Sequence, residues 1–362
     1  MKTKVRVIAF YLPQFYPTPE NDEWWEPGFT EWTNVARAKP LFKDHYQPRI
    51  PRDLGFYDLR VPETREKQAQ LAREAGIEGF CYWHYWFGNG ERLLHEVWDN
   101  VIRSGKPDFP ICLGWANHSW YSKTWDNSGN DILLKEQKYP GNKDYENHFY
   151  FALNAFKDDR YIKIDGRPLF FVYDAVSIPE DFIKLWNSLA LNNGLTKGIC
   201  FVGRIKNEKE YEKVKSKGFS YVTIERFRDI NIKCSKFKRR IHSVFNLILN
   251  RPINTYLYKN AMKYFLNVDF DGRDDVIPMI IPNWDHSPRS DYRAFIIHGS
   301  TPELFSEHVE QVLQVEYQKP TKDRIVFLKS WNEWGEGNYM EPDEKWGKGY
   351  ISSLYNKLKI NE

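Results

Sequence analysis

The feature that most constrains the fold of this chain is a repeated alternation of short apolar runs with amphipathic segments. Eight runs of six to ten residues are rich in β-branched and aromatic residues, and each is followed by a loop and a segment of helical period. Strands buried on both faces have this continuous apolar character, so the pattern predicts a parallel sheet. The predicted strands are residues 5–12, 76–85, 109–116, 167–173, 198–203, 221–227, 276–284 and 324–331.

The segments between these runs have the apolar spacing of helices. One of them begins with a clear start signal, in which the Thr301 hydroxyl precedes Pro302 and Glu303. Eight strand–helix units in strict alternation predict an α/β fold and favour a (β/α)8 TIM barrel over an open doubly wound sheet, with residues 1–362 as a single domain. The predicted helices are residues 62–75, 92–103, 145–156, 179–191, 208–216, 256–265, 302–317 and 351–358.

Two insertions depart from a minimal barrel. The first βα loop, residues 13–60, is long and rich in proline, so we expect it to fold over the rim and supply binding surface. The second, residues 228–250 after the sixth strand, concentrates lysine and arginine before an apolar run. It is a candidate for peripheral membrane contact through residues 233–251. The alternative is a basic, solvated helix that packs one face on the barrel.

Composition narrows the functional classes. The net charge of +3 is small beside 52 basic and 49 acidic residues, so nothing in the charge balance indicates a nucleic-acid partner. The first apolar run contains Arg6 and is broken by Pro13, which fits neither a signal peptide nor a membrane span. The four cysteines show no metal-ligand spacing, and three lie in predicted strands. We therefore expect reduced, buried thiols in a cytoplasmic protein.

Polar and aromatic side chains gather at the predicted carboxyl ends of the strands, where the active site of such a barrel lies. The chain has 14 Trp, 22 Tyr and 24 Phe, and sugar rings stack on flat aromatic faces, although core filling accounts for part of this content. The alternative for each side chain is that it satisfies a loop backbone group. The candidate substrate-binding residues are Tyr11, Gln14, His84, Tyr85, Trp115, Asn117, Trp120, Trp125, Trp284, Asp285, Trp331 and Asn332.

The stretch KSWNEWGEG, residues 329–337, holds two glutamates three positions apart. An extended strand would separate Glu333 and Glu336 by ~10 Å, whereas a turn brings such positions to roughly 5–6 Å between Cβ atoms, and Gly335 and Gly337 favour the turn. Carboxyl groups about 5–5.5 Å apart suit retaining glycoside hydrolysis, and roughly 6.5–9.5 Å suits inversion. The sequence therefore leans towards retention. The alternative is a calcium or structural-turn role, and few further Asp residues are nearby to bind calcium.

The pair has the chemistry that glycosidic cleavage needs. One carboxyl group must be protonated to serve the leaving oxygen, and another must be ionised to stabilise or attack the cationic carbon. Closely spaced carboxylates oppose each other's ionisation, and neighbouring indoles exclude water, so the pKa of one group is raised. Glu333 and Glu336 are therefore the candidate catalytic residues.

Six stretches carry a resemblance to a known family. The chain resembles the WbsX-type proteins of bacterial surface-polysaccharide gene clusters over nearly its whole length. That group is similar to the family 99 glycoside hydrolases, which are retaining endo-acting α-mannosidases and α-mannanases built on a (β/α)8 barrel. The stretches are residues 9–60, GFCYWHYWF at 79–87, LGWANHSWYSKTWD at 113–126, PNWDHSPR at 282–289, GSTPELF at 299–305 and SWNEWGEG at 330–337.

The family 99 sequence NEWHEG corresponds to residues 332–337 here. The resemblance implies that Glu333 draws the proton from a sugar 2-hydroxyl, so that this oxygen attacks the anomeric carbon and forms an epoxide-like intermediate. It implies that Glu336 is the general acid and then the base for water or a sugar hydroxyl. Gly335 replaces the family's histidine, which leaves the acceptor side and the substrate open. This route requires a free 2-hydroxyl trans to the leaving group, as in α-mannose.

We expect a carbohydrate-active enzyme of retaining glycoside hydrolase type that cleaves or transfers an α-glycosidic bond in bacterial surface polysaccharide (O-antigen or capsule) metabolism. Mannose is the candidate sugar, and the substrate is an oligosaccharide or polysaccharide, free or lipid-linked. The alternatives are a nucleotide-sugar-dependent glycosyltransferase and a catalytically silent sugar-binding protein. The one D-x-D sequence, Asp269-Phe270-Asp271, has no nucleotide-binding context, and binding alone needs no glutamate pair. No sequence feature implies a metal or organic cofactor.

Overall fold

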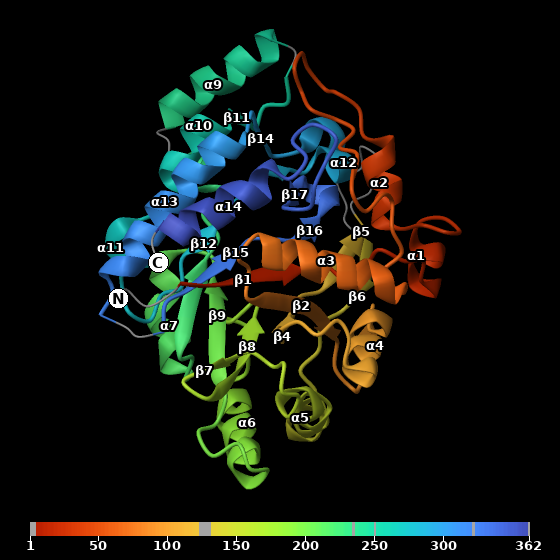
Figure 1. Ribbon diagram of the computed structural model, residues 1–362, viewed down its shortest axis with the longest axis vertical. Helices are drawn as coiled ribbons and strands as arrows, with labels where there is room; N and C mark the ends of the chain where they lie inside the picture. The colour runs from red at the N-terminus through yellow and green to blue at the C-terminus, as the bar shows by residue number, and fades with distance from the viewer. Residues whose placement is uncertain (1–4, 123–131, 234–235, 250, 321–322, 361–362) are drawn as a thin grey trace.

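The computed structural model describes residues 5–122, 132–233, 236–249, 251–320 and 323–360, and it contains eight parallel strands in a barrel (Figure 1). Neighbouring strands pair in the order β10-β9-β8-β4-β2-β1-β15-β12, and a parallel bridge from Val222 to Val276 joins the two ends. The predicted (β/α)8 barrel is therefore confirmed. Its strands are β1 (Arg6–Tyr11), β2 (Gly79–Trp86), β4 (Ile111–Trp115), β8 (Arg167–Val172), β9 (Cys200–Ile205), β10 (Tyr221–Ile224), β12 (Met279–Ile280) and β15 (Ile325–Leu328).

Helices cover the outside of the barrel, and seven of the predicted segments are helical at or near the expected bounds. No helix in the described ranges is both long and apolar enough to cross a bilayer. The outer helices are α3 (Pro62–Glu74), α4 (Glu96–Ser104), α5 (Asn142–Phe156), α6 (Glu180–Asn192), η1 (Glu208–Glu210) with α7 (Tyr211–Ser216), α13 (Pro302–Gln318) and α14 (Gly349–Ile360).

Shorter elements occupy the connections between these units. They include the insertion after β10 and a small sheet that runs in the order β11-β14-β13. They are α1 (Pro19–Trp24), α2 (Glu31–Arg37), β3 (Arg92–Leu93), β5 (Trp120–Ser122), β6 (Ile132–Lys135), β7 (Lys163–Ile164), α8 (Asp229–Lys233), α9 (Lys236–Ile248), β11 (Thr255–Leu257), α10 (Tyr258–Ala261), η2 (Met262–Tyr264), α11 (Val268–Asp271), β13 (Trp284–Asp285), α12 (Ser287–Ser290), η3 (Asp291–Arg293), β14 (Ile296–His298), β16 (Asn332–Glu333), η4 (Trp334–Glu336) and β17 (Asn338–Tyr339).

Three predicted elements are wrong in part. The predicted helix 92–103 begins as strand β3, because Arg92 and Leu93 pair with Trp86 and Tyr85 of β2. The predicted helix 256–265 begins as strand β11, because Tyr256 pairs with Ile297 of β14. The predicted strand 276–284 is reduced to the two residues of β12. Pro278 and Pro282 flank β12, and proline has no N–H to donate to a strand ladder.

Aromatic side chains fill the barrel interior. Phe10 of β1 stacks on Trp83 of β2 at 4.7 Å between ring centroids and meets Phe171 of β8 edge-on at 4.7 Å. Phe327 of β15 lies 5.1 Å from Phe10. Part of the high aromatic content is therefore core filling, the alternative that the composition left open.

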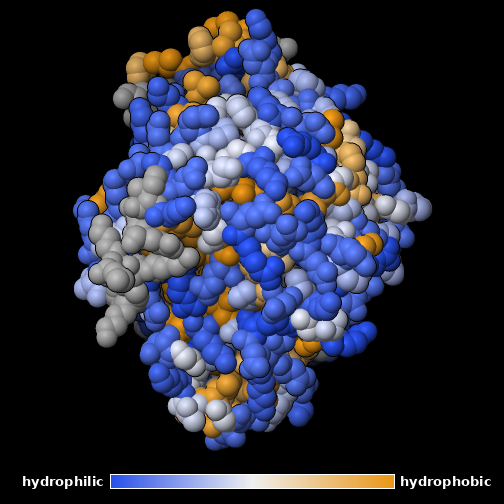
Figure 2. All heavy atoms as spheres, in the orientation of Figure 1, coloured by the Kyte–Doolittle hydropathy of each residue, from blue (hydrophilic) through white to orange (hydrophobic). Residues whose placement is uncertain are grey.

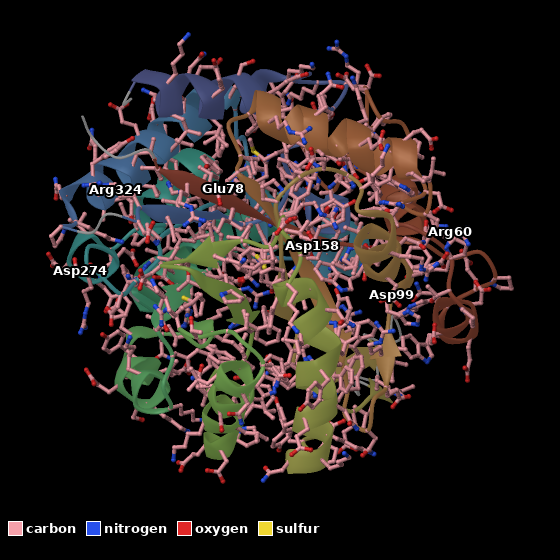
Figure 3. All side chains as sticks on the ribbon, turned by 60° about the horizontal axis from the view of Figure 1, so that its bottom comes forward. Arg60, Glu78, Asp99, Asp158, Asp274 and Arg324 are labelled. Atoms are coloured by element: carbon pink, nitrogen blue, oxygen red, sulfur yellow. The ribbon has the colours of Figure 1, made fainter. Side chains whose placement is uncertain are left out.

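Ion pairs stabilise the amino-terminal end of the barrel, away from the carboxyl ends of the strands. Arg6 Nε lies 2.7 Å from Glu78 Oε2, and Arg160 Nη2 lies 2.7 Å from Asp158 Oδ2. Glu78 and Asp158 are labelled in Figure 3. Arg160 Nη1 also donates to the carbonyl of Pro107 at 2.9 Å, so this end is built for stability.

The segment between β1 and α3 folds over the opposite end of the barrel. Trp32 in α2 donates its Nε1 proton to the carbonyl of Tyr57 at 2.7 Å, and the Tyr57 hydroxyl donates to Glu341 Oε2 at 2.9 Å. These bonds fix α2 beside the turn η4, with Trp32 and Trp334 5.7 Å apart between ring centroids. The rim segment thus becomes a rigid wall.

We predict that Trp186→Ala lowers the free energy of unfolding by about 3–5 kcal/mol, because truncation of a buried tryptophan leaves a cavity. Trp186 in α6 is fully buried and lies 4.7 Å from Phe170 and 4.8 Å from Phe182 between ring centroids. Urea titration followed by circular dichroism measures the change. Leu191→Ala on the exposed side of α6 is the matched control and should change stability by less than about 0.5 kcal/mol. Equal effects of the two variants would contradict the packing described.

Candidate active site

The two glutamates lie on a tight hairpin beyond the carboxyl end of β15. β16 pairs antiparallel with β17, and the turn η4 joins them. Side chains three apart eclipse each other in a 3-10 turn, so Glu333 and Glu336 project to the same side. Gly337 ends the turn at φ 55°, and a β-carbon there would lie 2.7 Å from Cβ of Asp285. The turn expected from the sequence is therefore present, and glycine is required to close it.

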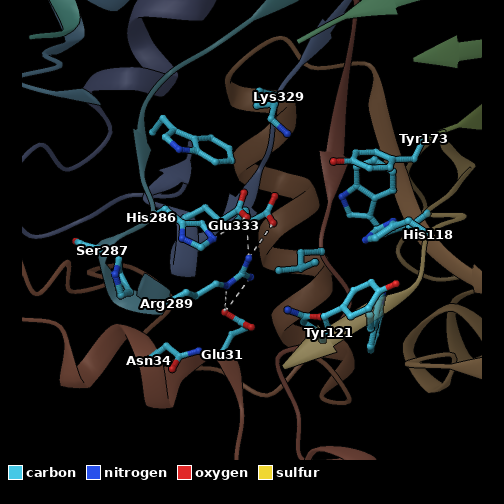
Figure 4. A pocket seen from close by; sticks show the side chains of 18 of the residues that line it. Glu31, Asn34, His118, Tyr121, Tyr173, His286, Ser287, Arg289, Lys329 and Glu333 are labelled. Atoms are coloured by element: carbon cyan, nitrogen blue, oxygen red, sulfur yellow. Dashed lines mark hydrogen bonds and ion pairs between the residues drawn. The ribbon is translucent and has the colours of Figure 1, made fainter. Parts of the chain in front are cut away.

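One arginine joins both glutamates. Arg289 of α12 places Nη1 2.8 Å from Glu336 Oε1 and 3.7 Å from Glu333 Oε1 (Figure 4). The carboxyl groups of Glu333 and Glu336 also hydrogen bond to each other. The pair is therefore a hydrogen-bonded dyad that shares one cation.

A third carboxylate completes this cluster. Glu31, the first residue of α2 in the rim segment, lies 3.0 Å from both Nε and Nη2 of Arg289. A β-carbon at Gly335 would collide with Glu31 Oε2 and lie 3.0 Å from Arg289 Nε. The Glu31–Arg289 pair therefore occupies the space beside residue 335 that a side chain would need.

The cluster separates the pKa values of the two glutamates. Burial raises the pKa of Glu333, the negative charge of Glu336 raises it further, and the result is about 8. Burial acts on Glu336 in the same sense, but Arg289, His286 and Lys329 lower its pKa below the ordinary value. Because Arg289 is closer to Glu336, we place the negative charge on Glu336 and the proton on Glu333 in the free protein.

A second charged group lies beside the dyad. Lys329 Nζ donates to Glu225 Oε1 at 3.1 Å, and Arg204 Nε lies 3.5 Å from the same oxygen. Arg204 also lies over the ring of Tyr173 at 3.8 Å. Lys329 in turn lies 5.4 Å from the ring centre of Trp284, so an ammonium group separates Glu225 from an aromatic wall.

These groups open into a cavity of about 1250 Å³ at the carboxyl ends of the strands. Aromatic side chains form part of its walls: Phe227 stacks on Trp284 at 3.8 Å, and Tyr85 meets Trp120 edge-on at 5.0 Å between centroids. Its rim is formed by residues 21–41 on one side and by Arg228 and the start of α8 on the other. A cavity of this size exceeds the usual range for a small-molecule site and suits an extended ligand.

Six of the residues selected from the sequence line this cavity. They come from the ends of different strands and from the rim, and the barrel brings them together. Trp125 lies outside the described residues. The six are Gln14, Tyr85, Trp120, Trp284, Glu333 and Glu336.

Four further candidates, at the ends of β1, β2 and β4, lie in the interior and do not line the cavity. The Tyr11 hydroxyl donates to Gln68 Oε1 at 2.7 Å, and His84 Nε2 lies 2.9 Å from His148 Nε2. Trp115 donates to the carbonyl of Trp86, and Asn117 bonds to Asp174. Alternate residues of a strand face opposite sides, so Tyr11 and His84 point to the outer helices while Phe10 and Tyr85 point inward.

The remaining three candidates stabilise the loops behind the site. Asp285 is fully buried and accepts from His45 Nε2 at 2.9 Å and Gln47 Nε2 at 2.8 Å. Asn332 bonds both ways to the backbone of Leu12, at 2.8 and 3.0 Å. Trp331 is buried, and its backbone N–H donates to the carbonyl of Phe10 at 2.7 Å.

Sequence reasoning missed the residues that bind the dyad together. Arg289 and Glu31 were not selected, although both lie in the stretches that carry the family resemblance. Neither shows a local pattern, because they meet only in the folded chain, 258 positions apart.

In the described ranges, no group of three or more His, Cys, Asp and Glu side chains is arranged to hold a metal ion.

Sequence comparison identifies related proteins. The model of the family described as Glycosyltransferase WbsX matches residues 7–354. Two curated relatives, each called "Uncharacterized protein WxcX", from two strains of Xanthomonas campestris pv. campestris, are 32% identical over 375 residues. The match covers 97% of this chain and 49% of each relative, so the chain spans about half the length of the curated relatives it matches.

Two solved structures share the fold. A GH99 endo-α-mannosidase from Bacteroides thetaiotaomicron superposes with a TM-score of 0.58 at 13% identity, covering 98% of this chain and 96% of that one. A structure described as a glycoside hydrolase-like protein gives 0.61 at 14% identity, covering 98% and 94%. At such identities the likeness concerns the fold alone.

We predict that Arg289→Gln lowers the free energy of unfolding by about 3–5 kcal/mol near pH 7, because it leaves buried carboxylates without their cation. The matched control is Arg37→Gln, which breaks the exposed pair with Glu26 and should change stability by about 0–1 kcal/mol. Chemical denaturation measures both. The double variant Glu31→Gln/Arg289→Gln should be less destabilised than the sum of its single changes, and strict additivity would argue against the cluster.

We predict opposite pH-dependent effects for the two glutamates. The folded chain keeps a proton on Glu333 up to about pH 8, whereas the ordinary pKa is 4.5, so its stabilising effect is complete below 4.5 and is lost as the pH rises through 8. The free energy of unfolding of Glu333→Gln should therefore rise relative to that of wild type between pH 5 and pH 9. The full gain corresponds to about 1.4 kcal/mol for each unit by which the pKa of Glu333 is shifted.

Glu336→Gln should lose stability relative to wild type above about pH 4.5, and this loss should shrink as the pH falls. The lowered pKa of Glu336 contributes stability above about pH 4.5, which is lost as the pH falls through its folded value. Urea unfolding at pH 3, 5, 7 and 9 measures the difference from wild type for each variant. Parallel profiles for the two variants would show that the charge is not divided between the glutamates as described.

Proposed function

The chain belongs to the WbsX glycosyltransferase family, and we propose that it is a carbohydrate-active enzyme of glycoside hydrolase type that cleaves or transfers an α-glycosidic bond. The observation that carries the proposal is the hydrogen-bonded dyad of Glu333 and Glu336 in an aromatic cavity at the carboxyl ends of the barrel strands. A dyad that holds one proton supplies both the acid and the base that glycosidic cleavage needs.

The proposed reaction begins with a shift of that proton. The free protein has the proton on Glu333 and the charge on Glu336, whereas the resemblance to family 99 implies the reverse during catalysis. Because the two carboxyl groups touch, binding of substrate that draws Arg289 away from Glu336 lets the proton pass from Glu333 to Glu336. Glu333 is then the base, and Glu336 is the acid.

Two displacement steps follow. Glu333 accepts the proton of the sugar 2-hydroxyl, O2 attacks the anomeric carbon, and Glu336 protonates the departing glycosidic oxygen. In the second step Glu336 removes a proton from water or a sugar hydroxyl, which attacks the anomeric carbon and opens the three-membered ring, and Glu333 returns a proton to O2. Two inversions give net retention, and the chemistry requires a 2-hydroxyl trans to the leaving group.

The proposed substrate is an α-linked oligosaccharide or polysaccharide of bacterial surface glycan metabolism, with mannose as the candidate sugar. The size of the cavity and its aromatic walls support an extended glycan. We further propose that the glycan is carried on a lipid and that the protein acts in the cytoplasm. The latter is supported by Cys81, Cys112 and Cys200, which are buried and free.

The family description favours transfer over hydrolysis, and both are compatible with the same intermediate. A donor bound as a nucleotide sugar is the second candidate. The Asp269-Phe270-Asp271 sequence gives it little support, because Asp271 is buried and accepts from Arg226 Nε at 2.9 Å and Nη2 at 3.1 Å. Its carboxylate is thus already paired with a buried arginine.

The test measures turnover of a panel of α-linked oligosaccharides by wild type, Glu333→Gln and Glu336→Gln, with product anomers followed by NMR. Wild type should release or transfer sugar with retention, and each variant should lose at least about 10²-fold in kcat, since acid–base groups contribute about 10²–10⁴-fold. Glu310→Gln on α13, whose partner is Lys357, is a carboxyl-to-amide control outside the cavity and should keep full turnover.

Nucleotide-sugar donors are included as a separate arm of the assay. Turnover with those donors alone, or activity that survives in both dyad variants, would reject the glycosidase-type proposal. Sugar binding by calorimetry without turnover of any donor would instead indicate a sugar-binding protein.

A further inference from the structure

Helix α9 in the insertion after β10 turns its polar side towards the body of the protein. His242 Nε2 lies 2.8 Å from the carbonyl of Thr255, and the His242 ring stacks on Tyr256 at 4.5 Å between centroids. Asn246, which is buried, donates to the carbonyl of Ile253 at 3.0 Å. The alternative expectation for this segment, a basic helix that packs one face on the body of the protein, agrees with these contacts, and the packed face is the polar one.

The apolar side of α9 faces outward. Phe237, Ile241, Val244 and Ile248 follow the spacing of one helical stripe, and their exposed fractions are 74, 54, 50 and 75%. Figure 2 shows the resulting apolar patch at the top of the molecule, over α9. Contiguous exposed apolar surface of this kind marks an interaction site. Three exposed residues widen the patch: Phe245, Leu247 and Leu249.

The segment around this stripe is strongly basic. Residues 230–268 contain eight Lys and Arg residues and no Asp or Glu, although the whole chain has a net charge of only +3. Arg240 is exposed on α9 beside the stripe, whereas Arg239 is exposed on the polar side of the helix and donates to the carbonyl of Asn231 at 3.3 Å. An apolar helix face flanked by positive charge complements a membrane surface, in which anionic headgroups cover an apolar acyl region.

We propose that the outward face of α9 docks on a lipid surface with anionic headgroups, its apolar stripe entering the acyl boundary while Arg240 and the other basic residues of the segment attract the headgroups. A second copy of the chain would bring two segments of the same high positive charge together, which opposes pairing. A peptide partner requires a groove, whereas α9 presents a convex, single-helix face at the edge of the molecule (Figure 1).

The docking face lies next to the entrance of the cavity. Arg228 and Asp229, which precede the stripe, line the cavity, and so does Ile232, whose exposed fraction is 69%. Docking through α9 would therefore hold this side of the entrance near the headgroups. Resting on the proposed function, this arrangement would deliver the glycan of a lipid-linked substrate to the dyad while its lipid stays in the bilayer.

The test is co-sedimentation with vesicles of phosphatidylcholine alone or with the anionic lipid phosphatidylglycerol added. Wild type should bind the anionic vesicles, and its affinity should fall as salt rises. Phe237→Ser/Ile241→Ser/Ile248→Ser should weaken binding at least about tenfold, because it removes the inserted stripe. Arg239→Glu/Arg240→Glu should weaken binding and flatten its salt dependence.

The matched control is Leu191→Ser, which removes an exposed leucine from α6, and it should bind as wild type does. The triple variant should keep the circular dichroism spectrum and the turnover of a soluble oligosaccharide. Failure of wild type to bind, equal binding by the triple variant, or self-association that the triple variant abolishes without vesicle binding would each overturn docking. Vesicle binding does not require turnover, so a failed glycosidase assay would leave the docking result intact.

Discussion

The placement of one guanidinium among three buried carboxylates is the interaction on which the rest of the site depends. Carboxylates that lie this close together repel one another when ionised, and a nearby cation offsets that repulsion. Arg289 supplies that cation from the short helix α12, and its partners come from the rim segment and from the hairpin turn. The cluster therefore couples the position of the rim wall to the charge of the dyad.

The hairpin that carries the dyad is itself held from behind. Asn332 bonds to the backbone at the end of β1, and Trp334 stacks on Tyr339 at 3.8 Å while donating to Glu341 at 2.6 Å. Burial raises the pKa of Glu341 to about 7 even though Trp334, Gln68 and Tyr57 all donate to it. These buried, hydrogen-bonded side chains behind the hairpin fix the orientation of Glu333 and Glu336. Catalysis requires that reactive groups be held in a defined geometry.

Sequence reasoning found those parts of the molecule that have a local signal. Buried strands read as apolar runs, and Glu333 and Glu336 are close in the chain, so both the barrel and the dyad could be recognised. Tyr11 and His84 were placed at the wrong face, because position at a strand end does not by itself say which side of the sheet a residue occupies. Arg289 and Glu31 were missed because their contact is made only by the tertiary fold. The basic, apolar composition of the insertion could be read from the sequence. Which way the apolar side of α9 faces could not, because it depends on contacts that polar residues such as Asn246 make in the folded chain.

The missing side chain at residue 335 has a consequence for how this site changes in evolution. A histidine at this position, as in the family 99 sequence, and the Glu31–Arg289 pair would compete for the same space, so a side chain at 335 requires the pair to shift. A lineage that acquires a side chain at 335 must first lose or move the ion pair, and a lineage that acquires the pair must first empty position 335. The side chains at positions 31, 289 and 335 therefore depend on one another, and substitutions among them are expected to be strongly epistatic.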